Sequence, residues 1–374
     1  MKSVRLGNFI EEHCEKNKKG EDIPVFSVTN TNGFCTEYFS KDVSSKDKSN
    51  YKIVHKGFFA YNPSRINVGS VDWLRNEEKV IVSPLYNVFS VSPELEKQYL
   101  YYFLKSERGK TLIKSKAEGS VRDNLKFSIL ADFPIPLPSI EEQRKFVAKL
   151  DKSNDLIFKY KRLLEYYDTL IKSRFIEMFG DNPVKSGKWN VETLGDVCSS
   201  IVRGPFGSAL KKEFFVPKSD KTIKVYEQKH AIQKSSTIGS YYITQEKYEE
   251  LKRFECKPGD FLMSCSGTMG EFYQLPDKCE KGIINQALCK FTLNNRIESL
   301  FFLEWMKQSI HNLETKGSGI QNVAAVSFIK QMPVFLPPMQ LQNNFAAFVH
   351  QIDKSKFEIW LTLQNYDIIE KRVF

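Results

Sequence analysis

The sequence predicts a mixed α/β protein (α+β type) with two similar globular domains in tandem, each followed by a long helix. Three observations lead to this prediction. The chain has 374 residues, of which 41% are hydrophobic, so it can form two domains with cores of their own. The second half of the sequence repeats the first. Each copy ends in a segment whose apolar residues recur at helical spacing.

The repeat is clearest near the end of each copy. Leu137-Pro138 recurs as Leu336-Pro337, which lies 199 residues later. The same offset joins further identical residues up to the end of the chain: Gln143 with Gln342, Phe146 with Phe345, Leu164 with Leu363, and Phe175 with Phe374. A match of this length at one offset indicates an internal duplication.

Upstream of this region the offset drifts, as we expect if the loops differ in length. It is 202 residues between Gly57 and Gly259, and 188 residues between Leu6 and Leu194. We therefore divide the chain into a first domain (1–138), a first long helix (139–180), a second domain (181–337) and a second long helix (338–374).

Short β-rich runs and aromatic-rich stretches alternate within the domains. Residues 79–82 and 86–91 are typical of strands, because they are rich in β-branched and aromatic side chains and turn residues bound them. Residues 98–104 and 300–306 precede the two long helices. We expect both stretches to be helical, with their aromatic side chains in the core.

Both long segments carry a heptad-like seam of apolar residues, which favours a paired coiled coil. The seam residues are Phe146, Leu150, Ile157, Leu164, Ile171 and Met178 in the first segment, and Phe345, Val349, Ile352, Ile359, Leu363 and Tyr366 in the second. Ser139 and Glu142 have the spacing of a capping box at the start of the first helix. One such helix alone could bury its stripe in a large core, but two copies at the same place favour pairing.

The charge of the chain is shared by the two domains. There are 55 Lys and Arg against 45 Asp and Glu, a formal net charge of +10. By segment, residues 1–138 carry +4, residues 139–180 carry +2, residues 181–337 carry +4 and residues 338–374 carry 0. This distribution favours two similar domains that each hold an anionic partner.

The composition argues against several classes of protein. No stretch approaches the ~20 consecutive apolar residues of a membrane helix. The start of the chain becomes charged too early for a signal peptide, so we expect a cytoplasmic protein. The seven cysteines form no CxxC pair and the five histidines do not cluster near them, so we expect reduced thiols and no metal site.

The sequence also lacks the motifs of common enzymes. Gly109-Lys110-Thr111 resembles the end of a P-loop, but Leu104 stands where the first glycine belongs. Residues 62–65 (NPSR) resemble the Asn-Pro-Pro-aromatic motif of amino-methyltransferases, but Ser64 and Arg65 replace its last two residues. No GxSxG, HExxH or EF-hand loop occurs. We therefore expect no catalytic residues and no cofactor bound by this chain.

Two related motifs open the long helices, LPSIEEQR at 137–144 and LPPMQLQ at 336–342. Weaker motifs lie at 60–69, 203–208, 264–270, 282–287 and 317–322. Together, in order and in two copies, they resemble the specificity (S) subunit of type I restriction–modification systems, and the resemblance covers essentially all 374 residues. Gln340 and Leu341 depart from the family pattern, because an acidic pair is usual there and would help to cap the helix.

This resemblance implies a fold and a function. Each globular domain would be a target recognition domain that reads one half of a bipartite site in double-stranded DNA. The two long helices would pack antiparallel between the domains as a spacer, with pseudo-two-fold symmetry. The helices would also dock two modification subunits, which carry S-adenosylmethionine and methylate adenine N6. Up to two restriction subunits, which use ATP and Mg, would join them, and this chain would be non-catalytic.

The candidate DNA contacts are basic, amide and hydroxyl side chains, the types that hold phosphates and read base edges. In the first domain they are Asn62, Ser64, Arg65, Asn67, Arg122 and Asn124. In the second domain they are Arg203, Ser208, Lys211, Ser264, Ser266, Thr268, Gln321 and Asn322. Two alternatives stay open: a self-contained methyltransferase–nuclease fusion, and a coiled-coil scaffold that binds only proteins.

Overall fold

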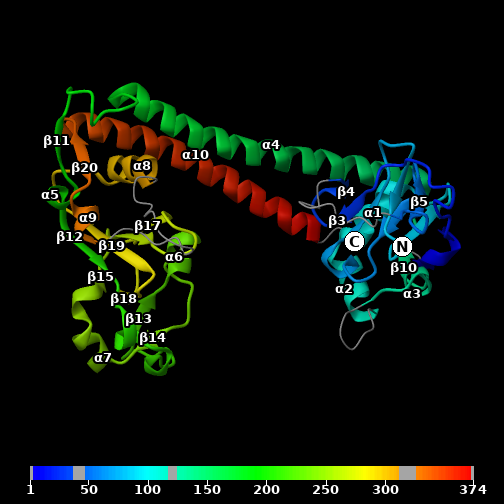
Figure 1. Ribbon diagram of the computed structural model, residues 1–374, viewed down its shortest axis with the longest axis horizontal. Coiled ribbons are helices and arrows are strands. Elements are labelled where there is room, and N and C mark those ends of the chain that lie inside the picture. Colours follow the sequence, from blue (N-terminus) through cyan, green and yellow to red (C-terminus); the bar gives the residue numbers. More distant parts are fainter. Residues whose placement is uncertain (1–2, 37–46, 117–123, 311–325, 372–374) are drawn as a thin grey trace. The chain divides into compact units, whose positions relative to one another are not determined.

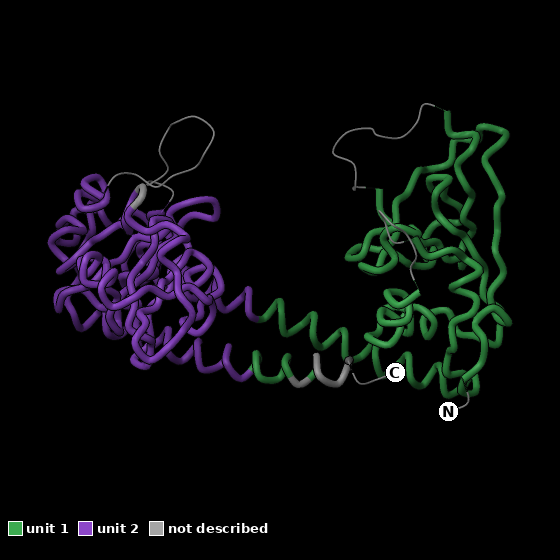
Figure 2. The backbone as a smooth tube through the Cα atoms, turned by 90° about the horizontal axis from the view of Figure 1, so that it is seen from below, with its two compact units in different colours: residues 1–163, 359–374 green, residues 164–358 purple. Residues whose placement is uncertain are grey.

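The computed structural model describes residues 3–36, 47–116, 124–310 and 326–371. Two compact units divide the chain (Figure 2): unit 1 comprises residues 1–163 and 359–374, and unit 2 comprises residues 164–358. The division therefore runs through both long helices rather than at their ends. The long helices contribute to both cores: Phe146 lies against the core of unit 1, whereas Phe175 and Phe345 belong to the core of unit 2.

Unit 1, whose globular part is mostly blue and cyan in Figure 1, contains a four-stranded antiparallel sheet with the strand order β2-β9-β6-β7. Its strands are β2 (Ile10–His13), β9 (Asn87–Val91), β6 (Phe59–Tyr61) and β7 (Val71–Trp73). Three antiparallel pairs accompany it: β1 (Ser3–Arg5) with β10 (Pro134–Pro136), β3 (Ser27–Thr29) with β4 (Gly33–Cys35), and β5 (Lys52–His55) with β8 (Lys79–Val82). The helices are α1 (Lys97–Lys105), α2 (Glu107–Lys116) and α3 (Phe127–Ala131), with 3-10 turns η1 (Leu6–Asn8) and η2 (Ile66–Val68).

Unit 2 contains a sheet of the same kind, with the order β12-β19-β16-β17. Its strands are β12 (Cys198–Arg203), β19 (Leu288–Leu293), β16 (Phe261–Ser264) and β17 (Phe272–Gln274). A second sheet has the order β14-β13-β18-β15, formed by β14 (Tyr242–Ile243), β13 (Ile223–Tyr226), β18 (Gly282–Ile284) and β15 (Glu255–Cys256), and β11 (Asn190–Thr193) pairs with β20 (Pro333–Leu336). The helices are α5 (Leu194–Val197), α6 (Gln228–Ile232), α7 (Gln245–Glu250), α8 (Ser299–Ser309) and α9 (Val326–Lys330), with η3 (Gly207–Leu210), η4 (Lys212–Phe214) and η5 (Lys252–Phe254).

The predicted internal repeat is confirmed for the main sheet and for two further strand pairs of each unit. The sheet β2-β9-β6-β7 of unit 1 has its counterpart in β12-β19-β16-β17 of unit 2, and the pairs β1–β10 and β5–β8 correspond to β11–β20 and β15–β18. The predicted strands at 79–82 and 86–91 are β8 and β9, and the aromatic stretches form α1 and α8 with most of their aromatic side chains in the cores. Strand β13 runs parallel to β18, and its counterpart among the described residues of unit 1 is one parallel bridge between Val25 and Ile81.

Both long helices form as the apolar pattern predicts. Helix α4 covers Ile140–Phe179 and α10 covers Met339–Lys371. The predicted capping box precedes α4: the backbone N–H and hydroxyl of Ser139 donate to Oε2 of Glu142 at 2.9 and 2.7 Å. In the part of the chain that the structure describes, no helix is long and apolar enough to cross a membrane.

The seam residues lie on the less exposed faces of the two helices. Ile171, Phe345, Val349, Ile352 and Ile359 are buried, and the remaining seam residues are half-buried. Within unit 2, the rings of Phe175 and Phe345 meet edge to face at 5.3 Å between centroids, and Lys356 forms an ion pair with Asp168. The order of these contacts is opposite along the two helices, so α4 and α10 run antiparallel in this unit.

A buried glutamine explains why the repeat is so well preserved at the start of α4. Gln143 is fully buried, and its side-chain oxygen accepts a hydrogen bond from the backbone N–H of Glu96 at 2.8 Å. Its amide donates to the carbonyls of Glu94 and Pro138, both at 3.0 Å. One side chain thus ties the start of the long helix to the start of α1.

The same connection recurs in unit 2. The side-chain oxygen of Gln342 accepts from the backbone N–H of Glu298 at 2.9 Å, and its amide donates to the carbonyl of Pro337 at 2.9 Å. Glu298 precedes α8 as Glu96 precedes α1. The Leu-Pro motif that opens each long helix therefore supplies a carbonyl to a repeated, buried contact.

Replacing either glutamine by leucine is expected to loosen one copy of the repeat and leave the other unchanged. The substitution Gln143→Leu leaves buried backbone groups without partners, which costs about 1–3 kcal/mol. Hydrogen exchange should therefore accelerate in α1 for Gln143→Leu and in α8 for Gln342→Leu. Gln351→Leu, at an exposed position of α10, is the matched control. Equal acceleration in both copies would contradict this assignment.

Candidate nucleic-acid interface

Several loops of unit 2 meet at one edge of the main sheet. Strand β19 runs antiparallel to both β12 and β16, so the ends of these two strands lie beside its start. The second sheet reaches the same place, because the N–H of Cys265 donates to the carbonyl of Ala287 at 2.8 Å and that of Asn285 donates to Tyr226 at 2.9 Å. We call residues 203–206, 226–228, 264–270 and 285–287 the edge loops of unit 2.

The first of these loops follows β12. Arg203, the last residue of the strand, places its guanidinium 5.1 Å from the ring centre of Phe206, and 65% of Phe206 is exposed. Gly204 is required here by close packing: a Cβ atom at this position would lie 1.9 Å from the backbone oxygen of Asn285. The motif at 203–206 thus packs against the loop at 285–287 and presents an arginine and an aromatic ring beside it.

The loop at 264–270 contains three predicted DNA contacts, and burial argues against one of them. Ser264 is fully buried, and its hydroxyl accepts a hydrogen bond from the backbone N–H of Glu271 at 2.9 Å. A buried side chain used in this way shapes the turn and is not available to DNA. Ser266 is half-buried and Thr268 is exposed, so these two remain at the edge together with Arg203.

Sequence reasoning missed Gln228, the first residue of α6. Its side-chain amide donates to the backbone carbonyls of Ser266 and of Thr268, the latter at 3.1 Å. Gln228 lies 38 and 40 residues from these partners. No repeat signal pointed to it, since residues around the equivalent bridge at Val25 include no glutamine.

The corresponding edge of unit 1 joins two segments that are far apart in sequence. Ser64 donates its hydroxyl to Oδ1 of Asn124 at 2.6 Å, across a separation of 60 residues. Oδ1 of Asn62 accepts the backbone N–H of Ser64 at 3.1 Å, which makes a local turn. Arg65 is exposed on this loop and Asn67 is half-buried in η2.

Sequence reasoning also missed Lys105, at the end of α1. Its ammonium group donates to the carbonyl of Asn30 at 3.1 Å and to that of Gly69. Burial lowers the pKa of Lys105. This lysine holds the far end of the loop that carries Asn62, Ser64 and Arg65.

For the remaining predicted DNA contacts, the structure describes no hydrogen bond that places them at a sheet edge. Lys211 is exposed and forms an ion pair with Glu213 at 3.6 Å. Ser208 lies in η3, and its side chain is outside the description. Arg122, Gln321 and Asn322 lie outside the described residues.

Apolar residues other than the seam are exposed on the long helices. On α4 they include Phe158 (60% exposed), Tyr166 and Leu170. On α10 they are Phe357, Trp360 (48% exposed) and Leu361, besides Met339 at its first turn. Among the described residues of the two helices, these side chains are more exposed than the seam residues, which are buried or half-buried.

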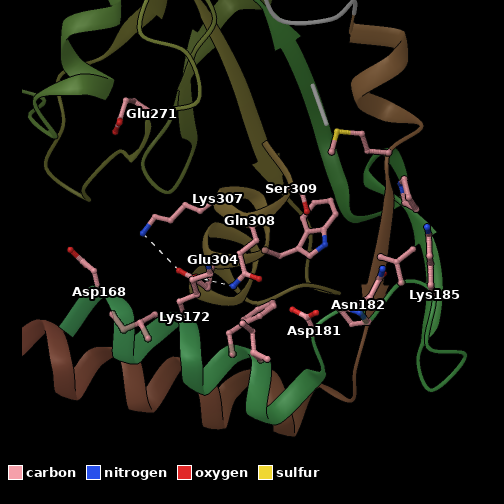
Figure 3. A pocket seen from close by; sticks show the side chains of 18 of the residues that line it. Asp168, Lys172, Asp181, Asn182, Lys185, Glu271, Glu304, Lys307, Gln308 and Ser309 are labelled. Atoms are coloured by element: carbon pink, nitrogen blue, oxygen red, sulfur yellow. Dashed lines mark hydrogen bonds and ion pairs between the residues drawn. The ribbon is translucent and has the colours of Figure 1, made fainter. Parts of the chain in front are cut away.

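A hollow of about 1200 Å³ lies in unit 2 beside the second half of α4 (Figure 3). Burial raises the pKa of Glu304, which accepts a hydrogen bond from Gln308 at 3.0 Å and lies 3.9 Å from the ammonium group of Lys307. Side chains of both charges line the hollow, among them Asp168 and Lys172. Among the described residues, no group of three or more His, Cys, Asp or Glu side chains is placed to hold a metal ion.

The model of the family described as "Type I restriction modification DNA specificity domain" matches residues 4–164 and 186–365. The chain is similar to the Type I restriction enzyme MjaIX specificity subunit of Methanocaldococcus jannaschii, with 31% identity over 306 residues, 74% of this chain and 66% of that subunit. It is also similar to the putative MjaX specificity subunit of the same organism, with 20% identity over 329 residues, 84% of this chain and 76% of that one. The chain thus spans just under two thirds of the MjaIX subunit.

Solved structures resemble the chain over its whole length. One comes from work on "complex assembly and conformational transition of the type I R-M system"; it has a TM-score of 0.64 and 17% identity, and the match covers 100% of this chain and 96% of that chain. Another is the type I restriction–modification S subunit from M. genitalium, with a TM-score of 0.51, 15% identity, and coverage of 100% and 95%. At these identities the likeness concerns the fold.

Proposed function

The chain belongs to the family of type I restriction–modification specificity subunits, and from this premise we propose that it reads a bipartite DNA sequence, one half with each globular part. The observation that carries the proposal is the repeated sheet edge. In both units the strand β6 or β16 is followed by a loop that contains small and polar residues, and a side chain from elsewhere in the unit donates to one or two carbonyls of that loop. Two equivalent DNA-binding edges, one in each unit, match a recognition sequence with two halves.

The chemistry of these loops suits nucleic acid. Arg203 and Arg65 supply guanidinium groups, which bind phosphate or pair with two acceptors of guanine. Ser64, Asn124 and Thr268 supply hydroxyl and amide groups, which bond to phosphates and base edges. The charge of +4 in each predicted domain favours the approach of a polyanion.

The long helices would fix the distance between the two half-sites. At 1.5 Å per residue the 40 residues of α4 span roughly 60 Å, which is at most ~17 base pairs of 3.4 Å. The heptad-like seam and the antiparallel contacts in unit 2 support a coiled-coil spacer with pseudo-two-fold symmetry. Such a rod would separate and join the two recognition domains.

The partners in this proposal are two modification subunits and up to two restriction subunits. The exposed apolar residues of α4 and α10 would be covered by the modification subunits, because exposed apolar surface of this kind favours protein contacts. S-adenosylmethionine, ATP and Mg would be bound by those partners. This chain would select the sequence, and the partner subunits would carry out the chemistry.

The test is DNA binding by the complex with its modification subunits at rising salt. Binding through several phosphates should weaken steeply, by roughly 10³-fold or more between 50 and 200 mM salt. Absence of binding, or binding that does not respond to salt, would favour a protein-only scaffold. Methylation of DNA by the isolated chain with S-adenosylmethionine would favour a self-contained enzyme.

A further inference from the structure

The tip of the loop at 264–270 is hydrogen-bonded by a side chain that does not belong to the loop. The base of the loop is closed by hydrogen bonds to Ser264, whose carbonyl accepts from the N–H of Gly270 at 3.0 Å. The tip carries Ser266, Gly267 and Thr268. The side-chain amide of Gln228 donates to the backbone carbonyls of Ser266 and of Thr268.

The tip lies directly against this amide. A Cβ atom added to Gly267 would come 3.8 Å from Nε2 of Gln228, and Gly267 has a φ of +62°, a conformation that glycine adopts without strain. Gly267 and Thr268 are exposed at the same time. The loop thus turns its carbonyls toward Gln228 and leaves the side chain of Thr268 toward solvent.

Gln228 lies next to a paired strand and a buried, hydrogen-bonded histidine. It follows β13, which pairs in parallel with β18. The neighbouring His230 is buried: its Nδ1 accepts the backbone N–H of Glu227 at 2.8 Å, and its Nε2 donates to the carbonyl of Ile238 at 2.8 Å. Burial lowers the pKa of His230.

We propose that Gln228 is a positioning residue that sets the base preference of the second half-site by holding Ser266–Thr268 in one conformation. The inference rests on the proposed function of the sheet edge. A loop that is ordered before binding loses less conformational entropy when DNA binds, and it presents fixed groups to the bases. Without the two hydrogen bonds, the loop must be ordered by DNA itself, which weakens selective binding more than non-selective binding.

In this proposal the side chain at position 228 must donate hydrogen bonds to the two carbonyls. The variants therefore either remove or restore a donor at this position. Gln228→Ala removes the donor. Gln228→Glu keeps the shape but places a carboxylate against two carbonyls, so it should act like the alanine variant or more strongly. Gln228→Lys restores a donor of the kind that Lys105 supplies in unit 1. Gln233→Ala, at an exposed glutamine just beyond α6, is the matched control.

The experiment uses the complex of the full chain with its modification subunits and a DNA library randomised in both half-sites. Sequencing of the methylated products gives the base preference in each half. We expect Gln228→Ala and Gln228→Glu to lower discrimination roughly tenfold in one half only. Non-selective DNA affinity should stay unchanged, and Gln228→Lys should restore most of the preference.

Three results would overturn the inference. Unchanged preference in both alanine and glutamate variants would show that Gln228 does not set specificity. An equal loss of selective and non-selective binding would mean that the substitution disrupts the whole domain. If the unsubstituted complex showed no bipartite preference, the proposed function would fail first and this inference with it.

Discussion

Replacing residues 1–138 by the corresponding segment of another specificity subunit is expected to change one half of the recognised DNA sequence and to leave the other half unchanged. The reason is that the edge loops of unit 2 are built entirely from residues 203–287, so the exchange alters none of them. Each mismatched base pair costs about 1–3 kcal/mol. Methylation at the original site should therefore fall by roughly 10³-fold when several bases differ.

The exchange must preserve the contacts between the domain and α4. Gln143 binds the segment before α1, and Phe146 packs edge to face on Tyr99 at 5.5 Å between ring centroids. The subunit that supplies the new domain should have glutamine and an aromatic residue at the positions equivalent to Gln143 and Phe146. The control is a chain in which residues 1–138 are replaced by the same residues through the same cloning steps. Sequencing of methylated adenines shows the outcome. A change in both half-sites would refute independent reading.

Inserting seven residues into α4 after Leu163 and seven into α10 after Glu358 should lengthen the preferred spacer between the half-sites. These points lie at the division between the units, so the contacts within each unit are kept. Seven helical residues add about 10.5 Å, which equals about three base pairs. A heptad also keeps the apolar seam on nearly the same face, because it rotates the helix by only ~20° relative to a 3.5-residue repeat.

The same insertion is expected to weaken binding even at the new spacing. Three base pairs turn the second half-site by roughly 100° about the DNA axis, since B-DNA repeats after about 10 base pairs. The control is an insertion of two residues in each helix, which moves the seam to the opposite face and should abolish DNA binding by the complex. A preferred spacer that stays unchanged after the heptad insertion would show that the helices do not measure the distance.

Most of the architecture was predictable because the repeated residue order and the spacing of apolar residues can both be recognised in the sequence. The offset of 199 residues identified the second Leu-Pro motif and the paired glutamines, and the structure shows why those glutamines recur: both join a long helix to the helix before it. The seam also predicted which faces of α4 and α10 are less exposed. Local capping by Ser139 and Glu142 followed from their spacing alone.

The candidate site was predicted less well, because the exposure of a loop residue depends on partners far along the chain. Ser264 was a reasonable choice by type, but it closes a turn and is buried. The heptad pattern identifies the less exposed face of each long helix, so it does not identify the apolar residues exposed on the other faces. Gln228 and Lys105 gave no pattern that a sequence could reveal, because their partners are backbone carbonyls, which every residue has.

The sequence by itself determined that this protein is a duplicated unit of domain plus helix, since identity at a constant offset and apolar periodicity are properties of residue order. It also determined that the excess positive charge is shared equally by the two domains. Only the tertiary structure decided which loops meet at the sheet edges, which of their side chains face solvent, and which distant side chains hold them. These features arise from strand pairing between distant segments, and such pairing is set by packing of the whole unit.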